Sequence, residues 1–179
     1  LGSLEAPHVV LGHSMGGAVA LEYALDAPTG LQALVLVSTG ARLRVHPSIL
    51  AALGPPEEDA TPRSPADEDF VRSVEPSPLT PRATALADWR AADAFDRMAR
   101  VHEIRTPTLI LVGDADPLTP LKYARFLHER IAGSSLVVLP GGAGSLDEFF
   151  EVLTWAQIGL HRKPILLLDA DGYWQPLLR

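Results

Sequence analysis

Short apolar runs alternate along the chain with segments whose apolar residues recur at helical spacing. The runs at 8–11, 31–37, 108–112, 136–139 and 165–168 predict strands, and the segments at 18–25, 120–131 and 145–160 predict helices. The run at 31–37 is nearly continuous, which is typical of a strand buried on both faces. This alternation predicts a single α/β domain over residues 1–179, with a mainly parallel sheet of about five strands and flanking helices.

The stretch from residue 41 to residue 100 interrupts the alternation. Eight of the 16 prolines lie between Pro47 and Pro81, together with a cluster of acidic residues. Two interpretations are open: a solvated surface insertion, or a helical cap over an active site. The segment at 86–99 is rich in helix formers and is expected to pack back onto the sheet.

Composition excludes several classes of protein. With 47% apolar and 21% charged residues, the chain has the balance of a folded globular domain. A formal charge of −7 argues against nucleic-acid binding, and no apolar run reaches the roughly 18 residues of a membrane-spanning helix. The absence of a signal-peptide pattern and of cysteine predicts a cytoplasmic protein without disulfides or thiolate catalysis. No histidine pair has metal-ligand spacing on one helix, and no metal is expected. No other cofactor is expected either.

The first chemical motif, GHSMGG, lies between a predicted strand and a predicted helix and fits the pattern G-x-S-x-G. A sharp strand-to-helix turn of this kind projects Ser14 above the sheet, and Gly12 and Gly16 would let the turn close. The Met15 amide, at the positive end of the helix, could donate to an oxyanion. The alternative is an ordinary glycine-rich turn.

The second motif, GDADPLTP, follows the predicted strand at 108–112. Polar groups at the carboxyl ends of parallel strands face ligands in α/β proteins, so Asp116 could orient a catalytic imidazole. The alternative is a turn in which Asp116 or Thr119 caps the next helix.

The segments VVLGHSMGGAVALEYAL, LQALVLVSTGARLRVHP and EIRTPTLILVGDADPLTPLKYARFLHERIAGSSLVVLPG resemble the α/β-hydrolase family over about residues 6–141. The resemblance implies Ser14 as nucleophile and Asp116, rather than Asp114, as the triad acid. It also implies a histidine directly after the Leu-Pro-Gly turn, where this chain has Gly142-Ala143-Gly144. Strands before the elbow, and a loop with a second oxyanion donor, are expected in the family and not in this chain, which therefore reads as truncated.

A third motif, P-G-G-x-G-S-x-x-E, begins at Pro140. A glycine-rich loop that opens a helix can bind phosphate through its amides, although the same residues form a helix-capping box. Together with FFEVLTWAQIGLHRKPILLLDADGYWQPLL, the motif resembles the lonely-guy (LOG) phosphoribohydrolase family over residues 139–179. The resemblance implies a nucleotide or phosphate site formed by Gly141, Gly142, Gly144, Ser145 and Glu148. The family's catalytic Arg-Lys segment is missing.

These observations favour a serine hydrolase that acts on a small ester or related acyl substrate, impaired by the missing histidine and the missing N-terminal strands. One alternative is a LOG-type enzyme that cleaves the N-glycosidic bond of a nucleoside 5'-monophosphate. Another is a non-catalytic chimera of two half-proteins joined near Leu139-Pro140-Gly141. Independently of either chemistry, an anion site is expected near Ser145, in the same crevice as Ser14.

Overall fold

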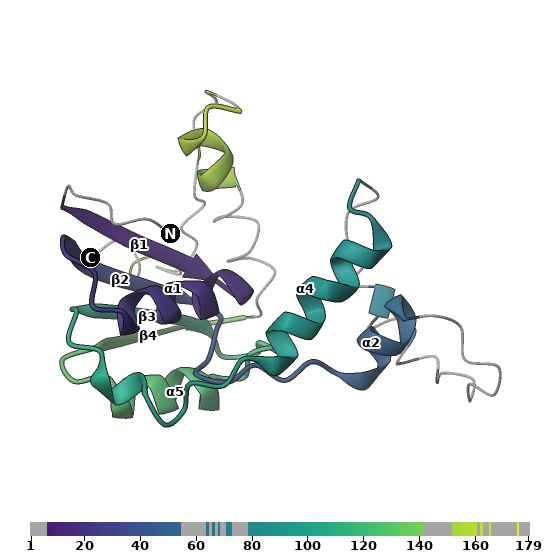
Figure 1. Cartoon of the computed structure of the whole chain (residues 1–179), viewed down its shortest axis with the longest axis horizontal. Helices are drawn as coiled ribbons and strands as arrows, with labels where there is room; N and C mark the ends of the chain where they lie inside the picture. The colour runs from purple at the N-terminus through teal and green to yellow at the C-terminus, as the bar shows by residue number, and fades with distance from the viewer. Residues whose placement is uncertain are drawn as a thin grey trace. The chain divides into compact units, whose positions relative to one another are not determined.

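A computed structural model describes residues 7–54, 64, 66, 68, 71–72, 79–141, 152–160, 162, 165 and 175. The chain divides into two compact units (Figure 1). The first comprises Leu1–Arg42 together with Asp96–Arg179, and the second comprises Leu43–Phe95. The sheet and the predicted site residues all belong to the first unit, which we call the sheet unit.

The sheet has four parallel strands in the order β1-β2-β3-β4. Their bounds are His8–His13 for β1, Leu31–Val37 for β2, Thr108–Gly113 for β3 and Ser135–Leu139 for β4. The predicted α/β class and parallel pairing are therefore confirmed. Because the strands are consecutive and parallel, all their carboxyl ends lie along one edge of the sheet.

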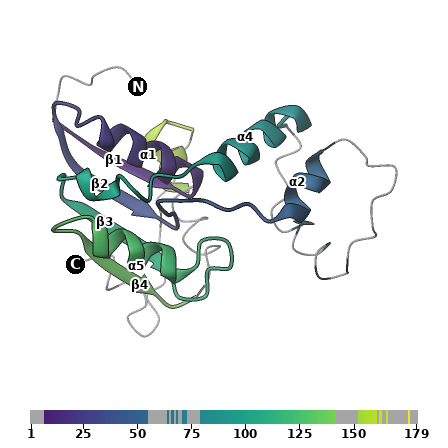
Figure 2. The same cartoon turned by 60° about the horizontal axis from the view of Figure 1, so that its bottom comes forward.

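Two helices cover one face of this sheet. Helix α1 spans Met15–Leu25 between β1 and β2, and α5 spans Leu121–Arg130 between β3 and β4. Right-handed crossovers between strands added in one direction place successive helices on the same face. Figures 1 and 2 show α1 and α5 arranged in this way.

The two faces of the sheet differ in burial. Leu34, Leu36 and Ile110, which alternate with the residues of the opposite face, are at most 1% exposed. On the opposite face a smaller cluster of Val37, Leu111 and Leu139 is fully buried, and Leu153 packs against it. At the edge strand β1, Val9 is 59% exposed. The apolar core is therefore most complete under α1 and α5 and near the carboxyl ends of the strands.

The fifth predicted strand, at 165–168, is not among the strands of the described residues. Ile165 lies outside any strand, and residues 166–168 lie outside the described residues, so the described sheet has four strands rather than about five. An apolar run predicts burial, but only pairing with a neighbouring strand satisfies its backbone groups as a strand. The helix expected at 145–160 is described only at 152–157, before Gly159, whose φ is 80°.

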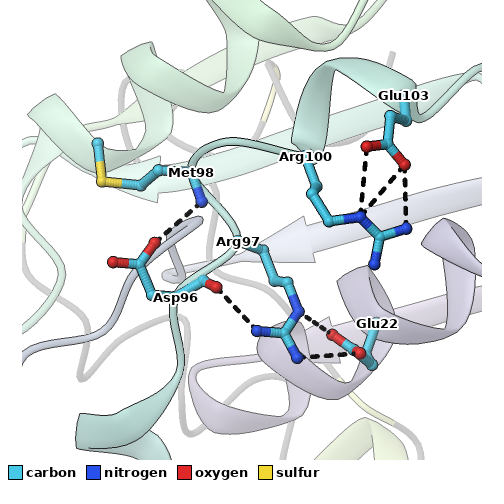
Figure 3. Close-up of polar contacts among 6 residues, drawn as sticks. All are labelled: Glu22, Asp96, Arg97, Met98, Arg100 and Glu103. Atoms are coloured by element: carbon cyan, nitrogen blue, oxygen red, sulfur yellow. Dashed lines mark hydrogen bonds and ion pairs between the residues drawn. The ribbon is translucent and has the colours of Figure 1, made fainter.

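A short connection, which includes the 3-10 helix η1 at Val101–Glu103, leads from residue 96 to β3. Here Arg97 donates to both carboxylate oxygens of Glu22 on α1, at 2.6 and 3.1 Å (Figure 3). This pairing lowers the pKa of Glu22, chiefly through the hydrogen bond from Arg97. A single antiparallel bridge joins Asp96 to Arg42 and brings together the two ends of the sheet unit that flank the second unit.

The second unit contains α2 at Pro47–Leu53 and α4 at Arg82–Ala94. Arg82, in the first turn of α4, donates to the carbonyl oxygens of Ala52, Leu53 and Gly54, so the two helices are tied together. The prediction of a helix at 86–99 was wrong at both ends. Pro81 supplies an N-cap before residue 86, and Phe95 is extended, which ends the helix ahead of the Asp96 bridge.

Candidate active site

Ser14 occupies a strained position between β1 and α1. Its backbone angles are φ 51° and ψ −120°, in a region where non-glycine residues are rare. The Ser14 amide donates to the carbonyl of Val37 at 3.0 Å, which ties the turn to β2. Ser14 is the N-cap residue of α1, yet its side chain makes no capping hydrogen bond. The hydroxyl is therefore not used in the way an ordinary capping serine uses it.

The glycines around Ser14 differ in whether a side chain could be accommodated at their positions. A Cβ at Gly12 would lie 2.3 Å from the carbonyl oxygen of Gly16, so the turn requires glycine there, as predicted. A Cβ at Gly16 would meet nothing within 4 Å, so the expectation that Gly16 is needed for closure was wrong. The second required glycine is Gly17, where a Cβ would lie 2.5 Å from the side chain of Thr39.

The residues directly after β2 were missed in the sequence. The hydroxyl of Thr39 donates to the carbonyl oxygen of Ser14 at 2.8 Å, and Thr39 is 3% exposed. Its neighbour Ser38 has φ 43°, is 2% exposed, and its hydroxyl has no hydrogen-bond partner among the described residues. The only sequence signal was their position after a buried strand, where α/β proteins collect polar groups.

Asp116 lies in the turn that follows β3. Its Oδ1 accepts from the amides of Leu118 and Thr119 at 2.9 and 2.8 Å, and its Oδ2 accepts from the Thr119 hydroxyl at 2.7 Å. The carboxylate is thus fixed in orientation and 5% exposed. Neither Asp116 nor Thr119 caps α5, because Pro120 is the N-cap of that helix.

Asp114 has a different task. It is exposed, and its Oδ1 accepts from the amide of Gly141 at 2.8 Å. The Ala115 amide donates to the Gly141 carbonyl at 2.9 Å, so the loop after β3 is bonded to the second residue after β4. Gly141, with φ 103°, begins the glycine-rich segment. The other residues proposed for that loop, Gly142, Gly144, Ser145 and Glu148, lie outside the described residues.

The topology brings the two predicted catalytic side chains to one edge. Ser14 follows β1 directly, and Asp116 follows β3, with the end of β2 between them. The register pairs His13 with Val37 and Val37 with Leu111, so Ser14 and Ser38 begin neighbouring loops. Such an edge suits acyl transfer, because a hydroxyl, a helix N-terminus and a held carboxylate all lie along it.

The described part of the chain has neither a metal-binding cluster nor a membrane-spanning helix. It contains no group of three or more His, Cys, Asp or Glu side chains that could hold a metal ion. Nor does any of its helices have the length and apolar character needed to cross a membrane.

Comparison with known sequences gives two overlapping matches. Residues 2–143 match the family described as serine aminopeptidase, S33, and residues 120–179 match the family described as possible lysine decarboxylase. The second match begins at residue 120, earlier than residue 139, where the predicted resemblance begins. Over 66 residues the chain is 47% identical to a cytokinin riboside 5'-monophosphate phosphoribohydrolase from Rhodococcoides fascians, covering 34% of this chain and 33% of that protein. The chain thus spans about a third of the length of such curated relatives.

Solved structures resemble the chain over a larger part. A thermophilic esterase aligns with a TM-score of 0.59 at 36% identity, covering 84% of this chain and 66% of the esterase. The enol-lactonase of Burkholderia xenovorans aligns with a TM-score of 0.64 at 23% identity, covering 86% and 65% respectively. The fold is therefore that of the α/β hydrolases. Since the match at residues 2–143 takes in most of the 179 residues, the chain belongs to the serine aminopeptidase S33 family.

Proposed function

We propose that the chain is a serine hydrolase that acts on a small ester or a related acyl compound, with Ser14 as its nucleophile. The observation that carries this proposal is the backbone of Ser14, with φ 51° and ψ −120° and a hydroxyl not used for capping. Strain of this kind costs about 1–3 kcal/mol and persists only where the surrounding structure enforces it. The similarity to a thermophilic esterase at 36% identity supports the choice of substrate class.

In the proposed reaction the Ser14 oxygen forms a bond to the acyl carbon, and the Met15 amide stabilises the resulting oxyanion. As the oxyanion collapses, the bond between the acyl carbon and the alcohol oxygen breaks, and the alcohol leaves with the proton that Ser14 gave up. Water then attacks the acyl carbon, which releases the acid and returns a proton to Ser14. In this proposal Asp116 would orient an imidazole, but the sequence has no histidine between Leu139 and Leu160. Without that base, proton removal from Ser14 is slow, so we expect weak turnover.

The proposal is tested by hydrolysis of p-nitrophenyl acetate. We expect slow release of nitrophenol by the wild-type chain and none above background by Ser14→Ala. Ser135, an exposed serine at the start of β4, supplies the matched control, because it lies at the opposite end of that strand from the site. Ser135→Ala should match the wild type. Equal rates for Ser14→Ala and the wild type would contradict the proposal.

A second candidate function is cleavage of the N-glycosidic bond of a nucleoside 5'-monophosphate. It is favoured by the match at residues 120–179 and by the 47% identity to a phosphoribohydrolase. In that reaction the loop from Gly141 to Ser145 would hold the phosphate and Glu148 would assist bond cleavage. The Gly141 amide already donates to Asp114, so the phosphate would depend on the later amides of the loop.

This second function predicts release of adenine from AMP, with loss of that release in Glu148→Gln. Ser14→Ala should leave it unchanged, which separates the two chemistries. Failure to detect adenine at high protein concentration would count against the second function and leave the first untouched. A phosphate titration followed by amide resonances would locate the anion site, and shifts confined to residues far from 142–146 would refute it.

A further inference from the structure

The loop that follows β2 is hydrogen-bonded to the strained turn at Ser14, which lies between β1 and α1. The Ser38 amide donates to the carbonyl of Leu111 at 2.9 Å, which anchors this loop to β3. Thr39 then lies beside the turn, and its hydroxyl bonds to the carbonyl oxygen of Ser14 at 2.8 Å. This hydrogen bond joins the loop after β2 to the turn after β1, and its donor is buried, since Thr39 is 3% exposed.

The carbonyl oxygen of Ser14 accepts hydrogen bonds from two sides. The Thr39 hydroxyl donates from the loop after β2, and the Gly17 amide donates at 3.0 Å from the first turn of α1. The carbonyl is therefore fixed in direction from the helix side and from the β2 side.

Fixing this carbonyl also fixes the amide of Met15. The Ser14 carbonyl and the Met15 N–H belong to one planar peptide group, which is trans because the described chain has no cis peptide bond. They point in opposite directions, so holding the oxygen aims the N–H. As the first residue of α1, Met15 has an amide without an intrahelical acceptor.

Gly17 makes this contact sterically feasible. A Cβ there would lie 2.5 Å from both Cβ and Cγ2 of Thr39 and 2.6 Å from its Oγ1. Any larger residue at position 17 would therefore push Thr39 away from Ser14. The close approach of residues 17 and 39 thus serves the same hydrogen bond that holds the Ser14 carbonyl.

We propose that Thr39 is a positioning residue for the oxyanion-binding amide: through the Ser14 carbonyl, its hydroxyl aims the Met15 N–H at the reacting oxygen. This inference rests on the proposed serine-hydrolase function. Thr39 touches neither substrate nor nucleophile oxygen in this scheme, and it acts only through the peptide group between residues 14 and 15. A preorganised donor loses its effect when its direction is no longer fixed.

The test compares Thr39→Val, which removes the hydroxyl at nearly constant volume, with Thr39→Ser, which retains it. A matched control is Thr108→Val, because Thr108 is 4% exposed and its hydroxyl donates to the Thr106 carbonyl at 2.8 Å, away from Ser14. The measured quantities are the rate of Ser14 labelling by a fluorophosphonate and the NMR resonance of the Met15 amide.

We expect Thr39→Val to lower the labelling rate by about tenfold and to shift the Met15 resonance. Thr39→Ser should keep the labelling rate and the Met15 resonance of the wild type. Thr108→Val should also change neither quantity, even if its melting temperature falls as much as that of Thr39→Val. Unchanged labelling together with an unchanged Met15 resonance in Thr39→Val would overturn the proposal. If Ser14 is not labelled even in the wild type, the serine-hydrolase function fails, and the Met15 resonance alone decides whether Thr39 aims that amide.

Discussion

The carboxylate of Asp114 accepts a 2.8 Å hydrogen bond from the backbone amide of Gly141. Together with the bond from Ala115 to the Gly141 carbonyl, it joins the loops that follow β3 and β4. Both loops lie at the edge of the sheet that carries Ser14. Asp114 therefore has a structural task close to the proposed site, distinct from the proposed role of Asp116.

Replacing Asp114 should loosen the start of the glycine-rich loop. We expect Asp114→Ala to speed hydrogen exchange of the Gly141 amide and to cost about 0.5–1.5 kcal/mol of unfolding free energy. Asp114→Asn is the control, because its side-chain oxygen can still accept from Gly141. Exchange at Gly141 that stays as slow in Asp114→Ala as in the wild type would show that this bond does not hold the loop.

The two glycines of α1 should respond in opposite ways to alanine. Gly17→Ala places a Cβ 2.5 Å from Thr39 and should lower the unfolding free energy by about 1–3 kcal/mol. Gly16→Ala meets nothing within 4 Å and should raise stability by about 0.5–1 kcal/mol, since alanine is the better helix former. Urea denaturation measures both. A loss of similar size in the two variants would contradict the predicted asymmetry.

Asp116 should matter for stability as well as for chemistry. Asp116→Ala leaves the amides of Leu118 and Thr119 and the Thr119 hydroxyl without their acceptor, so we expect a loss of about 1–3 kcal/mol in urea denaturation. Asp116→Asn keeps one acceptor oxygen at similar volume and should lose less. Equal losses in both variants would mean that packing, rather than these hydrogen bonds, determines the effect.

The Glu22–Arg97 ion pair should give stability that depends on pH. Because Arg97 lowers the pKa of Glu22 in the folded state, its contribution is complete above the ordinary glutamate pKa of about 4.3 and is lost as pH falls through the lower folded value. The melting temperature of the wild type should exceed that of Glu22→Gln at neutral pH. This difference should close in acid, below the folded pKa.

The control for this pH dependence is Glu103→Gln. Glu103 pairs with Arg100 at 3.0 Å, but the two residues are only three apart in sequence (Figure 3). Glu103→Gln should change the melting temperature less than Glu22→Gln, because the partner of Glu22 lies 75 residues away in sequence. A difference between wild type and Glu22→Gln that persists unchanged in acid would contradict the assignment.

The parts of the fold that could be predicted from sequence are those with a local cause. The nearly continuous apolar run at 31–37 predicted the bounds of β2, Leu31–Val37, without error. Helix α1 was expected to begin at Ala18, but it begins at Met15, because the sharp turn makes Ser14 the N-cap and places Gly16 and Gly17 inside the helix. Glycines that suggest a turn in the sequence can therefore lie inside a helix, and at Gly17 the close approach of Thr39 requires one.

The part of the site that could not be predicted depends on contacts between distant residues. Ser14 and Asp116 lie in short motifs with a recognisable spacing. Thr39 lies in no such motif. Its hydrogen bond to the Ser14 carbonyl, 25 residues away, can be seen only once β2 is paired with β1. The same holds for Asp114, whose partner Gly141 is 27 residues away and on another loop.

The sequence has no histidine between Leu139 and Leu160, and this gives a prediction of chemical rescue. If Ser14 lacks a histidine to remove its proton, free imidazole in solution should raise the rate of p-nitrophenyl acetate hydrolysis by the wild-type chain. Ser14→Ala, measured at the same imidazole concentrations, gives the direct reaction of imidazole with the ester. An increase of the same size in both proteins would show that imidazole does not act through Ser14.

The most direct test of Ser14 as the nucleophile is the site of covalent modification. The folded wild-type chain is incubated with a fluorophosphonate, digested, and its peptides are mapped by mass spectrometry. We predict one adduct, on Ser14, that is absent from Ser14→Ala and from wild-type chain unfolded before labelling. An adduct located on another serine, or equal labelling of the Ser14→Ala chain, would contradict the assignment of Ser14 as the nucleophile.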